Sequence, residues 1–217
     1  LAKERGKCEF YERTKYADGL LPIDTYKKEV DDLAKFKYTC DWEWLRSQIQ
    51  EHGVRHSTLS AQMPSESSSV VSNATNGIEP PRALLSTKKS KKGPLKQLVP
   101  QYQTLKNHYT LLWDMPSNEG YINIVSVMQK FFDQAISGNW SYNPLHYENN
   151  EVPMSVMIKD LLTTYKLGWK TSYYQNTYDY KGEEDTVQPQ GIQDTVQTDI
   201  EQMPQEDNEE MCDACAI

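Results

Sequence analysis

The chain has 217 residues, of which 37% are hydrophobic and 25% are charged, and its formal net charge is −8. Eleven acidic residues and one basic residue fall in residues 181–217, so the rest of the chain is near neutral and offers no strongly basic, nucleic-acid-binding surface. No apolar run approaches the ~20 residues of a membrane span, and the first residues lack the apolar core of a signal peptide. Four cysteines suit a reducing compartment, and we expect a cytoplasmic protein.

Short helices are predicted at the beginning of the chain. Leu1–Arg5 looks like the last turn of a helix that ends at Gly6. Because one turn is costly to nucleate alone, we expect this helix to continue on another chain, as in a split or longer subunit, or to fray. Residues 24–33 can form a helix capped by one of their first two residues, and Asp41 is a good N-cap for a helix through His52.

A serine-rich stretch, HSTLSAQMPSESSSVVSNATNGIEPPR, occupies His56–Arg82. Residues 57–63 could form a short strand, residues 64–69 a turn of small residues, and the segment from Val70 can turn helical. Such a turn can hold a phosphate, because backbone N–H groups converge on one spot and serine hydroxyls add donors. The turn contains no lysine and is not a Walker P-loop, and an ordinary serine-rich surface loop is the alternative.

The second half of the chain alternates predicted helices and strands. In chain order these are a hairpin over 83–100, helices over 105–113, 121–136 and 154–167, a loop over 138–152 between the last two, and a strand over 169–175. The helix over 154–167 begins at Pro153 and ends at Gly168. Its apolar stripe consists of Met154, Met157 or Ile158, Leu161, Leu162 and Tyr165, and we predict that this stripe faces the core.

Two pairs of residues are candidates for redox chemistry. Tyr173 and Tyr174 are adjacent in a predicted strand, where neighbours face opposite sides, so stacking them requires a local distortion; two ordinary strand residues are the alternative. Cys212 and Cys215 form a CxxC pair near the end of residues 181–217, which we predict to be a disordered acidic tail. Metal binding would need two further ligands, so we predict no metal site and a mobile dithiol instead.

Three motifs carry a family resemblance. They are STLSAQMPSESSS with the NATNGIEPPR that follows it, ADGLLPIDTYKKEVD at 17–31, and KTSYYQNT at 170–177. With them the chain resembles the C-terminal part of the large (alpha) subunit of class Ia ribonucleotide reductase. The resemblance implies an α/β fold in which residues 1–180 form the C-terminal portion of a ten-stranded α/β barrel and residues 181–217 form the flexible redox-shuttle tail.

The resemblance also implies an activity and its residues. Ribonucleoside diphosphates would be reduced to deoxyribonucleoside diphosphates by a radical mechanism. The residues implied to hold the substrate diphosphate are Pro64, Ser65, Glu66, Ser67 and Ser68. The tyrosine pair would relay an electron and a proton from the small subunit towards an active-site cysteine. The C-terminal dithiol would re-reduce the active-site disulfide and then be reduced by thioredoxin or glutaredoxin, although many members space this pair more widely.

Other parts of the family's machinery find no match in this sequence. The radical cysteine, the cysteines that form the disulfide and the nucleotide-effector sites would lie on an N-terminal part of the large subunit. The resemblance implies two protein partners, that N-terminal part and a small (beta) subunit with a dimetal–tyrosyl radical centre. The helix over 154–167 would help to form the groove for the small subunit's C-terminal tail. We expect no cofactor bound by this chain, no nucleic-acid partner and no membrane partner.

Two other functions are compatible with parts of the sequence. A non-catalytic assembly factor or decoy would keep the docking surface for the small subunit, but docking needs neither the tyrosine pair nor the dithiol. A redox carrier built on the tail alone would leave the first 180 residues unexplained.

Overall fold

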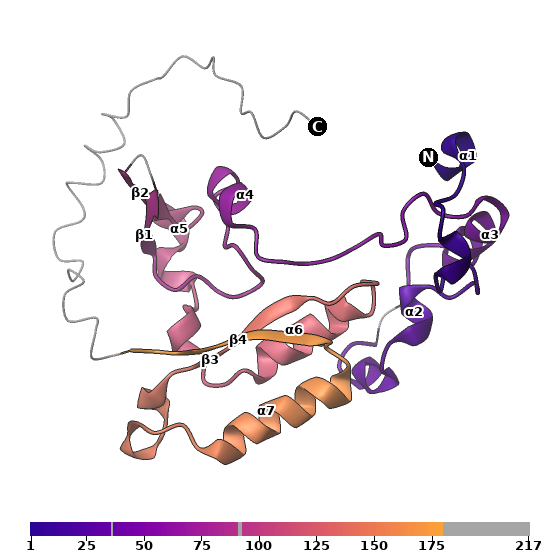
Figure 1. Ribbon diagram of the computed structural model, residues 1–217. Coiled ribbons are helices and arrows are strands. Elements are labelled where there is room, and N and C mark those ends of the chain that lie inside the picture. The colour runs from indigo at the N-terminus through magenta and orange to yellow at the C-terminus, as the bar shows by residue number, and fades with distance from the viewer. Residues whose placement is uncertain (36, 91–92, 180–217) are drawn as a thin grey trace, which may run out of the picture. The chain divides into compact units, whose positions relative to one another are not determined.

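The centre of the fold is a strand–helix–strand unit. The computed structural model describes residues 1–35, 37–90 and 93–179. Leu1–Tyr178 form one compact unit. Within it, β3 (Ser137–Tyr142) and β4 (Thr171–Thr177) pair in parallel and are connected through helix α7 (Met154–Leu167). A parallel pair requires such a crossover, which makes this part of the chain an α/β structure. Figure 1 shows α7 running beside the preceding helix, α6 (Glu119–Gln129).

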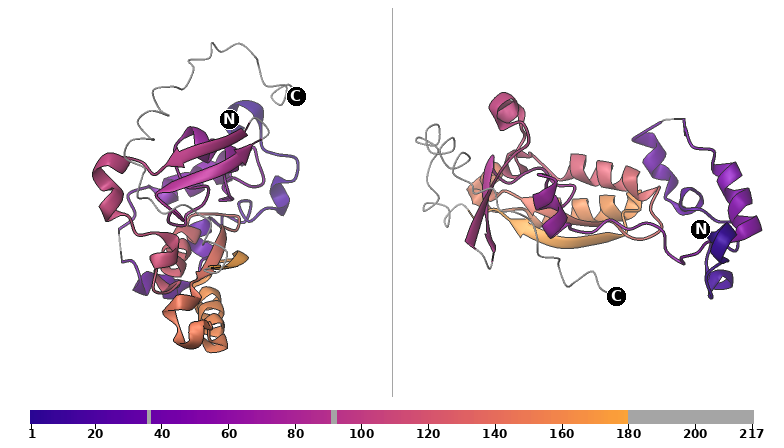
Figure 2. Two further views of the ribbon diagram at one scale, coloured as in Figure 1. Left: turned by 90° about the vertical axis from the view of Figure 1, so that its left-hand side faces the viewer. Right: turned by 90° about the horizontal axis from the view of Figure 1, so that it is seen from above.

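Aromatic side chains fix the strand pair to the two helices. The main core cluster comprises Val30, Tyr121, Ile122, Val125, Ile136, Trp140, Tyr142, Leu167 and Trp169. The indole Nε1 of Trp169 donates a hydrogen bond to the carbonyl oxygen of Ile136 at 2.7 Å, and its ring meets those of Tyr121 and Trp140 edge to face. In both views of Figure 2, α6 and α7 lie beside β3 and β4.

The remaining elements are short. They are α1 (Ala2–Arg5), α2 (Pro22–Thr25), α3 (Trp42–His52), α4 (Glu66–Val71), β1 (Leu85–Ser90), β2 (Gly93–Leu98), α5 (Tyr102–Leu105), and 3-10 turns at Tyr11–Arg13, Lys28–Asp32, Lys106–His108, Leu112–Asp114, Pro144–His146 and Glu148–Asn150. A second core cluster packs against α3 and consists of Tyr11, Tyr16, Leu21, Ile49 and Val54. Strands β1 and β2 form an antiparallel hairpin.

Several predicted elements are confirmed. The carboxylate of Asp41 accepts a hydrogen bond from Trp44 N at 2.9 Å and caps α3, and Gly53 follows the helix with a positive φ of 72°. The hairpin within 83–100 is present. Helix α7 begins and ends where predicted, with Gly168 in the left-handed conformation at its C-terminus, and β4 begins two residues later than the predicted strand.

Other predicted boundaries are wrong. Residues 57–63 form no regular strand, and only Gln62 makes an isolated parallel bridge, to Ile136. The helix predicted over 121–136 ends at Gln129, and all of β3 after its first residue lies in the region predicted as a loop, 138–152. The helix predicted over 24–33 is divided into α2 and a 3-10 turn, and that over 105–113 is broken into short turns.

The prediction for the apolar stripe of α7 is also wrong except at Met157, which packs against the main core cluster. Met154, Leu161, Leu162 and Tyr165 are each more than half exposed, and Ile158 is nearly so. The buried residues of this helix are Asp160, Thr164 and Leu167. The carboxylate of Asp160 accepts hydrogen bonds from Asn118 Nδ2 at 3.0 Å and Tyr142 Oη at 3.1 Å, and this pairing allows a charged residue to face the core.

Candidate functional site

The tyrosine pair lies at a β-bulge in β4. Gly138 pairs with Ser172, and the next residue of β3, Asn139, pairs with Tyr174, so Tyr173 is the extra residue on β4. A bulge breaks the alternation of side chains along a strand. Here it brings the two tyrosine rings together, with their centroids 4.3 Å apart and their planes inclined at 56°. The predicted distortion is therefore present, although the two rings are tilted towards each other and not stacked in parallel.

Both phenols are accessible. Tyr173 is 52% exposed and Tyr174 is 59% exposed, so neither ring is part of the core. A hydrogen bond between the two phenols, together with the charge that Tyr173 can carry, raises the pKa of Tyr174 above its ordinary value. The two hydroxyls therefore influence each other's ionisation, and the exposed rings leave room for a further group to approach them.

A side chain on the neighbouring strand joins the bulge. The backbone N–H of Tyr174 donates to Asn139 Oδ1 at 3.1 Å, and Asn139 Nδ2 donates in turn to Glu79 Oε1. The backbone N–H of Asn139 donates to the phenol oxygen of Tyr121 at 3.4 Å. Burial raises the pKa of Tyr121, and the nearby carboxylate of Glu79 raises it further. Sequence reasoning missed Asn139 because its strand was predicted as a loop.

The serine-rich stretch forms a closed loop around a short helix. Helix α4 begins at Glu66, inside the predicted turn, with Ser65 as its N-cap residue. The loop closes through a hydrogen bond from Ser65 N to the carbonyl oxygen of Asn76 at 2.7 Å. Ser65, Ser67 and Ser68 are exposed. As in any helix, the N–H groups of the first turn point beyond the helix end, where an acceptor can reach them.

The segment before this loop is held by Asp133. Its carboxylate accepts hydrogen bonds from Leu59 N at 2.7 Å, Ser60 N at 3.0 Å, Ser60 Oγ at 3.2 Å and Tyr16 Oη at 2.8 Å. Burial favours a higher pKa of Asp133, but these donors outweigh it and hold the pKa below its ordinary value. The carboxylate is therefore ionised near neutral pH. It holds Leu59 and Ser60, which precede Ser65 and Glu66 by six residues each.

The structure links the tyrosine pair to the serine loop. Glu79 follows Asn76, the residue that closes the loop, by three positions, and its carboxylate leads through Asn139 to Tyr174. Ile78, next to Glu79, packs against the main core cluster. Two hydrogen bonds thus join Tyr174 to Glu79, which lies three residues beyond the point where the serine loop closes. The other predicted pair, Cys212 and Cys215, lies outside the described residues, as does the rest of 181–217.

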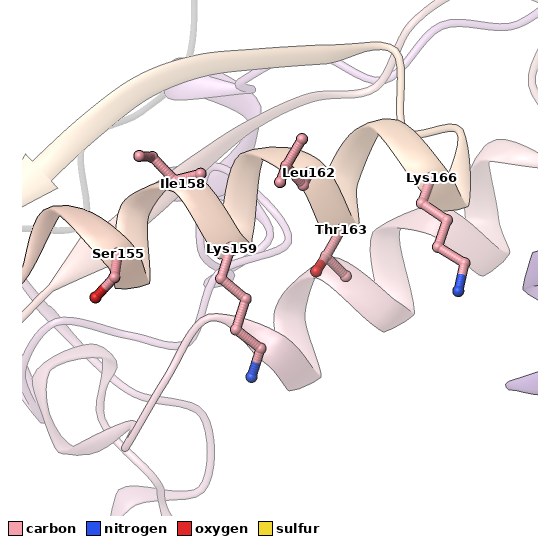
Figure 3. A pocket seen from close by; sticks show the side chains of 6 residues that line it. All are labelled: Ser155, Ile158, Lys159, Leu162, Thr163 and Lys166. Carbon is pink, nitrogen blue, oxygen red and sulfur yellow. The ribbon is translucent and has the colours of Figure 1, made fainter.

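The outward side of α7 carries an open apolar surface. Its depression is lined by Ser155, Ile158, Lys159, Leu162, Thr163 and Lys166. Figure 3 shows the side chains of Lys159, Thr163 and Lys166 extending to the same side, with Ile158 and Leu162 on the adjoining part of the surface. All six residues come from this one helix, so the depression has only one wall.

Residues 1–35, 37–90 and 93–179 contain no group of three or more His, Cys, Asp or Glu side chains suited to holding a metal ion. Over the same residues, no helix combines the length and the apolar character needed to cross a membrane.

Comparisons with known proteins agree on one family. The model of "Ribonucleotide reductase, barrel domain" matches residues 1–108 and 100–175. The ribonucleoside-diphosphate reductase subunit alpha of Haemophilus influenzae is 60% identical over 179 residues, which cover 82% of this chain and 24% of that protein.

Two further relatives extend the similarity. Subunit alpha of ribonucleoside-diphosphate reductase 1 from Escherichia coli K12 is 57% identical over the same 82% of the chain and 24% of its own length. The corresponding subunit of bacteriophage T4 is 45% identical over 85% of this chain and 25% of its own length. The chain thus spans about a quarter of the length of the curated relatives it matches.

Proposed function

The chain belongs to the family of ribonucleotide reductase barrel domains, and we propose that it forms part of a ribonucleoside-diphosphate reductase. In this role it contributes the C-terminal portion of a ten-stranded α/β barrel, of which β3, α7 and β4 are one strand–helix–strand repeat. The name shared by the relatives supports the reaction, in which ribonucleoside diphosphates become deoxyribonucleoside diphosphates. The parts of the subunit outside the matched quarter would carry the radical cysteine, the disulfide-forming cysteines and the effector sites.

The main support for this proposal is the contact between the rings of Tyr173 and Tyr174. When a neighbouring oxidant takes an electron from one phenol, the phenolic proton must leave as well, and the neutral phenoxyl radical remains. That radical can take an electron and a proton from the second phenol, which restores the first and moves the radical by one residue. The 4.3 Å separation of the ring centroids and the mutual influence of the two hydroxyls, which raises the pKa of Tyr174, support this assignment.

The oxidant would be supplied by the small subunit, and α7 would bring it close. A dimetal–tyrosyl radical centre in that subunit supplies the oxidising equivalent when the complex is assembled. The open apolar surface of α7 supports docking, because Ile158, Leu161 and Leu162 gain by burial and Lys159 and Lys166 attract acidic residues. The missing second wall of the depression would come from another part of the assembled enzyme.

Substrate would be held by the serine loop. Pro64, Ser65, Glu66, Ser67 and Ser68 are proposed to bind the diphosphate through backbone N–H groups and hydroxyls. The short helix alone would not identify a site; the resemblance of the whole stretch to the diphosphate loop is the reason for the assignment. The hydrogen bonds made by Asp133 support it, because they fix the chain that leads into the loop.

The tail would complete the cycle. Cys212 and Cys215 are proposed to pass electrons from thioredoxin or glutaredoxin to the active-site disulfide by thiol exchange. A tether of about thirty residues spans roughly 30 Å, which is enough to reach between a buried site and a separate reductase. We place this proposed enzyme in the cytoplasm, where thioredoxin and glutaredoxin keep thiols reduced.

A decoy or assembly factor is the competing function. It would need the surface of α7 but no bulge in β4, and an unbulged strand would place adjacent tyrosines on opposite faces. The bulge at Tyr173 therefore favours the enzyme.

A chimera can test the proposal. The matching quarter of the Haemophilus influenzae subunit alpha is replaced by residues 1–217, and the product is combined with the small subunit of that organism. We expect deoxyribonucleoside diphosphates to form in the presence of thioredoxin. A chimera that binds the small subunit and substrate with normal affinity, yet forms no product in a single turnover, would favour the decoy.

A further inference from the structure

We infer that Asn139 is a positioning residue for the tyrosine pair, because its side-chain amide joins the backbone of Tyr174 to the carboxylate of Glu79 and so holds the bulge in place. The inference rests on the proposed relay through Tyr173 and Tyr174. It assigns a specific role to a residue that touches neither the substrate nor the oxidised phenols.

The register of the two strands creates the need for the bridge. In a regular parallel ladder, the N–H groups of β4 donate to backbone carbonyls of β3. The bulge at Tyr173 interrupts this pattern, and the N–H of Tyr174 donates instead to the side-chain oxygen of Asn139, its register partner, at 3.1 Å. The side chain thus replaces a ladder hydrogen bond at the point where the distortion would otherwise leave a donor unpaired.

The two partners of the Asn139 side-chain amide determine its orientation. A carboxylate can only accept hydrogen bonds, so Glu79 must face the NH₂ group of Asn139, and the amide oxygen must then face Tyr174. Asparagine is suited to this place because one short side chain offers a donor and an acceptor in opposite directions. Aspartate would keep the acceptor but set two carboxylates against each other.

Buried aromatic rings hold the backbone of β3 in place beside Asn139. A Cβ atom added at Gly138 would come within 2.5 Å of the phenol oxygen of Tyr121 and 2.6 Å of the Trp169 ring. The backbone of β3 is therefore held against buried aromatic rings immediately before Asn139. On the other side, Glu79 is next to Ile78, which packs against the main core cluster. Both ends of the bridge are thus attached to the core, although the tyrosine rings are exposed.

A functional consequence follows from these contacts. Without the bridge, the N–H of Tyr174 loses its acceptor, and β4 can relax towards a regular strand in which adjacent side chains face opposite sides. The rings would then separate, and transfer between the phenols would slow. Substrate affinity should change little, because Glu79 lies beyond the point where the diphosphate loop closes, and the loop is held by its own hydrogen bond from Ser65 N to Asn76 O and by the contacts of Asp133.

The test is a cycle of variants in the chimeric reductase described above. Asn139→Asp should lower kcat at least tenfold and leave KM for the ribonucleoside diphosphate within twofold. Adding Glu79→Gln to that variant restores a donor facing the new carboxylate, and kcat should return to within threefold of the parent. The matched control is Asn149→Asp, the same chemical change at an exposed residue of the turn Glu148–Asn150, which should leave both constants unchanged.

A crystal structure of the Asn139→Asp chimera provides an independent measurement. We expect its ring centroids to lie well beyond the 4.3 Å of the parent pair. Unchanged kcat, a rise in KM alone, no recovery in the double variant, or ring centroids still about as close as in the parent would each overturn the inference. A Tyr174→Phe chimera separates the two hypotheses: if it is inactive while Asn139→Asp is active, only the inference fails, and if Tyr174→Phe is fully active, the relay itself is wrong.

Discussion

Tyr174→Phe is the substitution that best separates a relay function from a structural one. It removes one hydroxyl and keeps the ring, the backbone and the bulge. The side chain is 59% exposed, and the hydroxyl of Tyr173, which raises the pKa of Tyr174, is its nearest described influence on ionisation. The free energy of unfolding should therefore change little, whereas a relay would lose the O–H group on which it depends.

The two expected magnitudes differ widely. A typical hydrogen bond contributes about 0.5–1.5 kcal/mol to stability, and an exposed one lies at the lower end because water replaces it readily. We therefore expect the free energy of unfolding to fall by less than about 1 kcal/mol. A benzene ring has no phenolic proton to release, so turnover should fall at least about a thousandfold, equivalent to about 4 kcal/mol in the activation barrier.

The assay measures both quantities on the same protein. Product formation by the chimeric reductase gives the change in rate, and thermal or denaturant unfolding gives the change in stability. Tyr109→Phe is the matched control, because it removes a phenol that donates to the carbonyl oxygen of Pro100 at 2.8 Å, away from β4. Turnover by Tyr174→Phe within tenfold of the parent would refute the relay. A loss of stability of several kcal/mol would instead identify a structural role.

Three further predictions address the other proposed sites. Ser67→Asp places a negative charge at the diphosphate loop and should raise KM for the ribonucleoside diphosphate at least about tenfold, since like charges repel; unchanged KM would return this loop to an ordinary surface role. Leu162→Asp changes a side chain that is 61% exposed, so it should weaken binding of the small subunit, measured by surface plasmon resonance, while the melting temperature stays constant. Cys212→Ser combined with Cys215→Ser should permit one near-stoichiometric turnover and then stall with thioredoxin, with partial recovery in dithiothreitol; normal cycling with thioredoxin would exclude a shuttle.

Local signals in the sequence predict part of this fold well. Helix α3 has a capping aspartate before it and a glycine after it, and α7 has Pro153 and Gly168 at its ends. These signals act within a few residues, so they can be seen without knowledge of the tertiary structure. The contact between the two tyrosine rings is different. The sequence shows only that such a contact needs a distorted strand, because the bulge that distorts β4 depends on its pairing with β3.

The end of α6 depends on contacts that the sequence does not display. Gln129 Nε2 donates to the carbonyl oxygen of Gln134 at 2.8 Å, and its Oε1 accepts from Ile136 N at 3.0 Å. One side chain thus satisfies backbone groups that a continued helix would have paired. Ile136 fits the helical period only by coincidence, because its side chain is buried at the start of β3. Strand β3 was missed for a related reason, since SGNWSY has the composition of a loop.

Helix α7 shows the limit of hydrophobic patterns as a guide to burial. Its most apolar face is exposed, while Asp160 and Thr164 are buried against the rest of the chain. A pattern of apolar residues indicates that a face is suited to burial, but it does not say whether the same chain or another protein will cover it. The sequence therefore predicted the helix correctly and assigned its stripe to the wrong surroundings.

The order of elements gives this exposed face a direct connection to the tyrosines. Helix α7 ends at Gly168, Trp169 is anchored by its hydrogen bond to the carbonyl oxygen of Ile136, and Tyr173 follows four residues later. Because this anchor is buried, the core fixes the point at which the chain passes from α7 to β4. A partner bound on α7 would thus have its position defined relative to the bulge in β4, and the radical path would begin at the element that directly follows the docking surface.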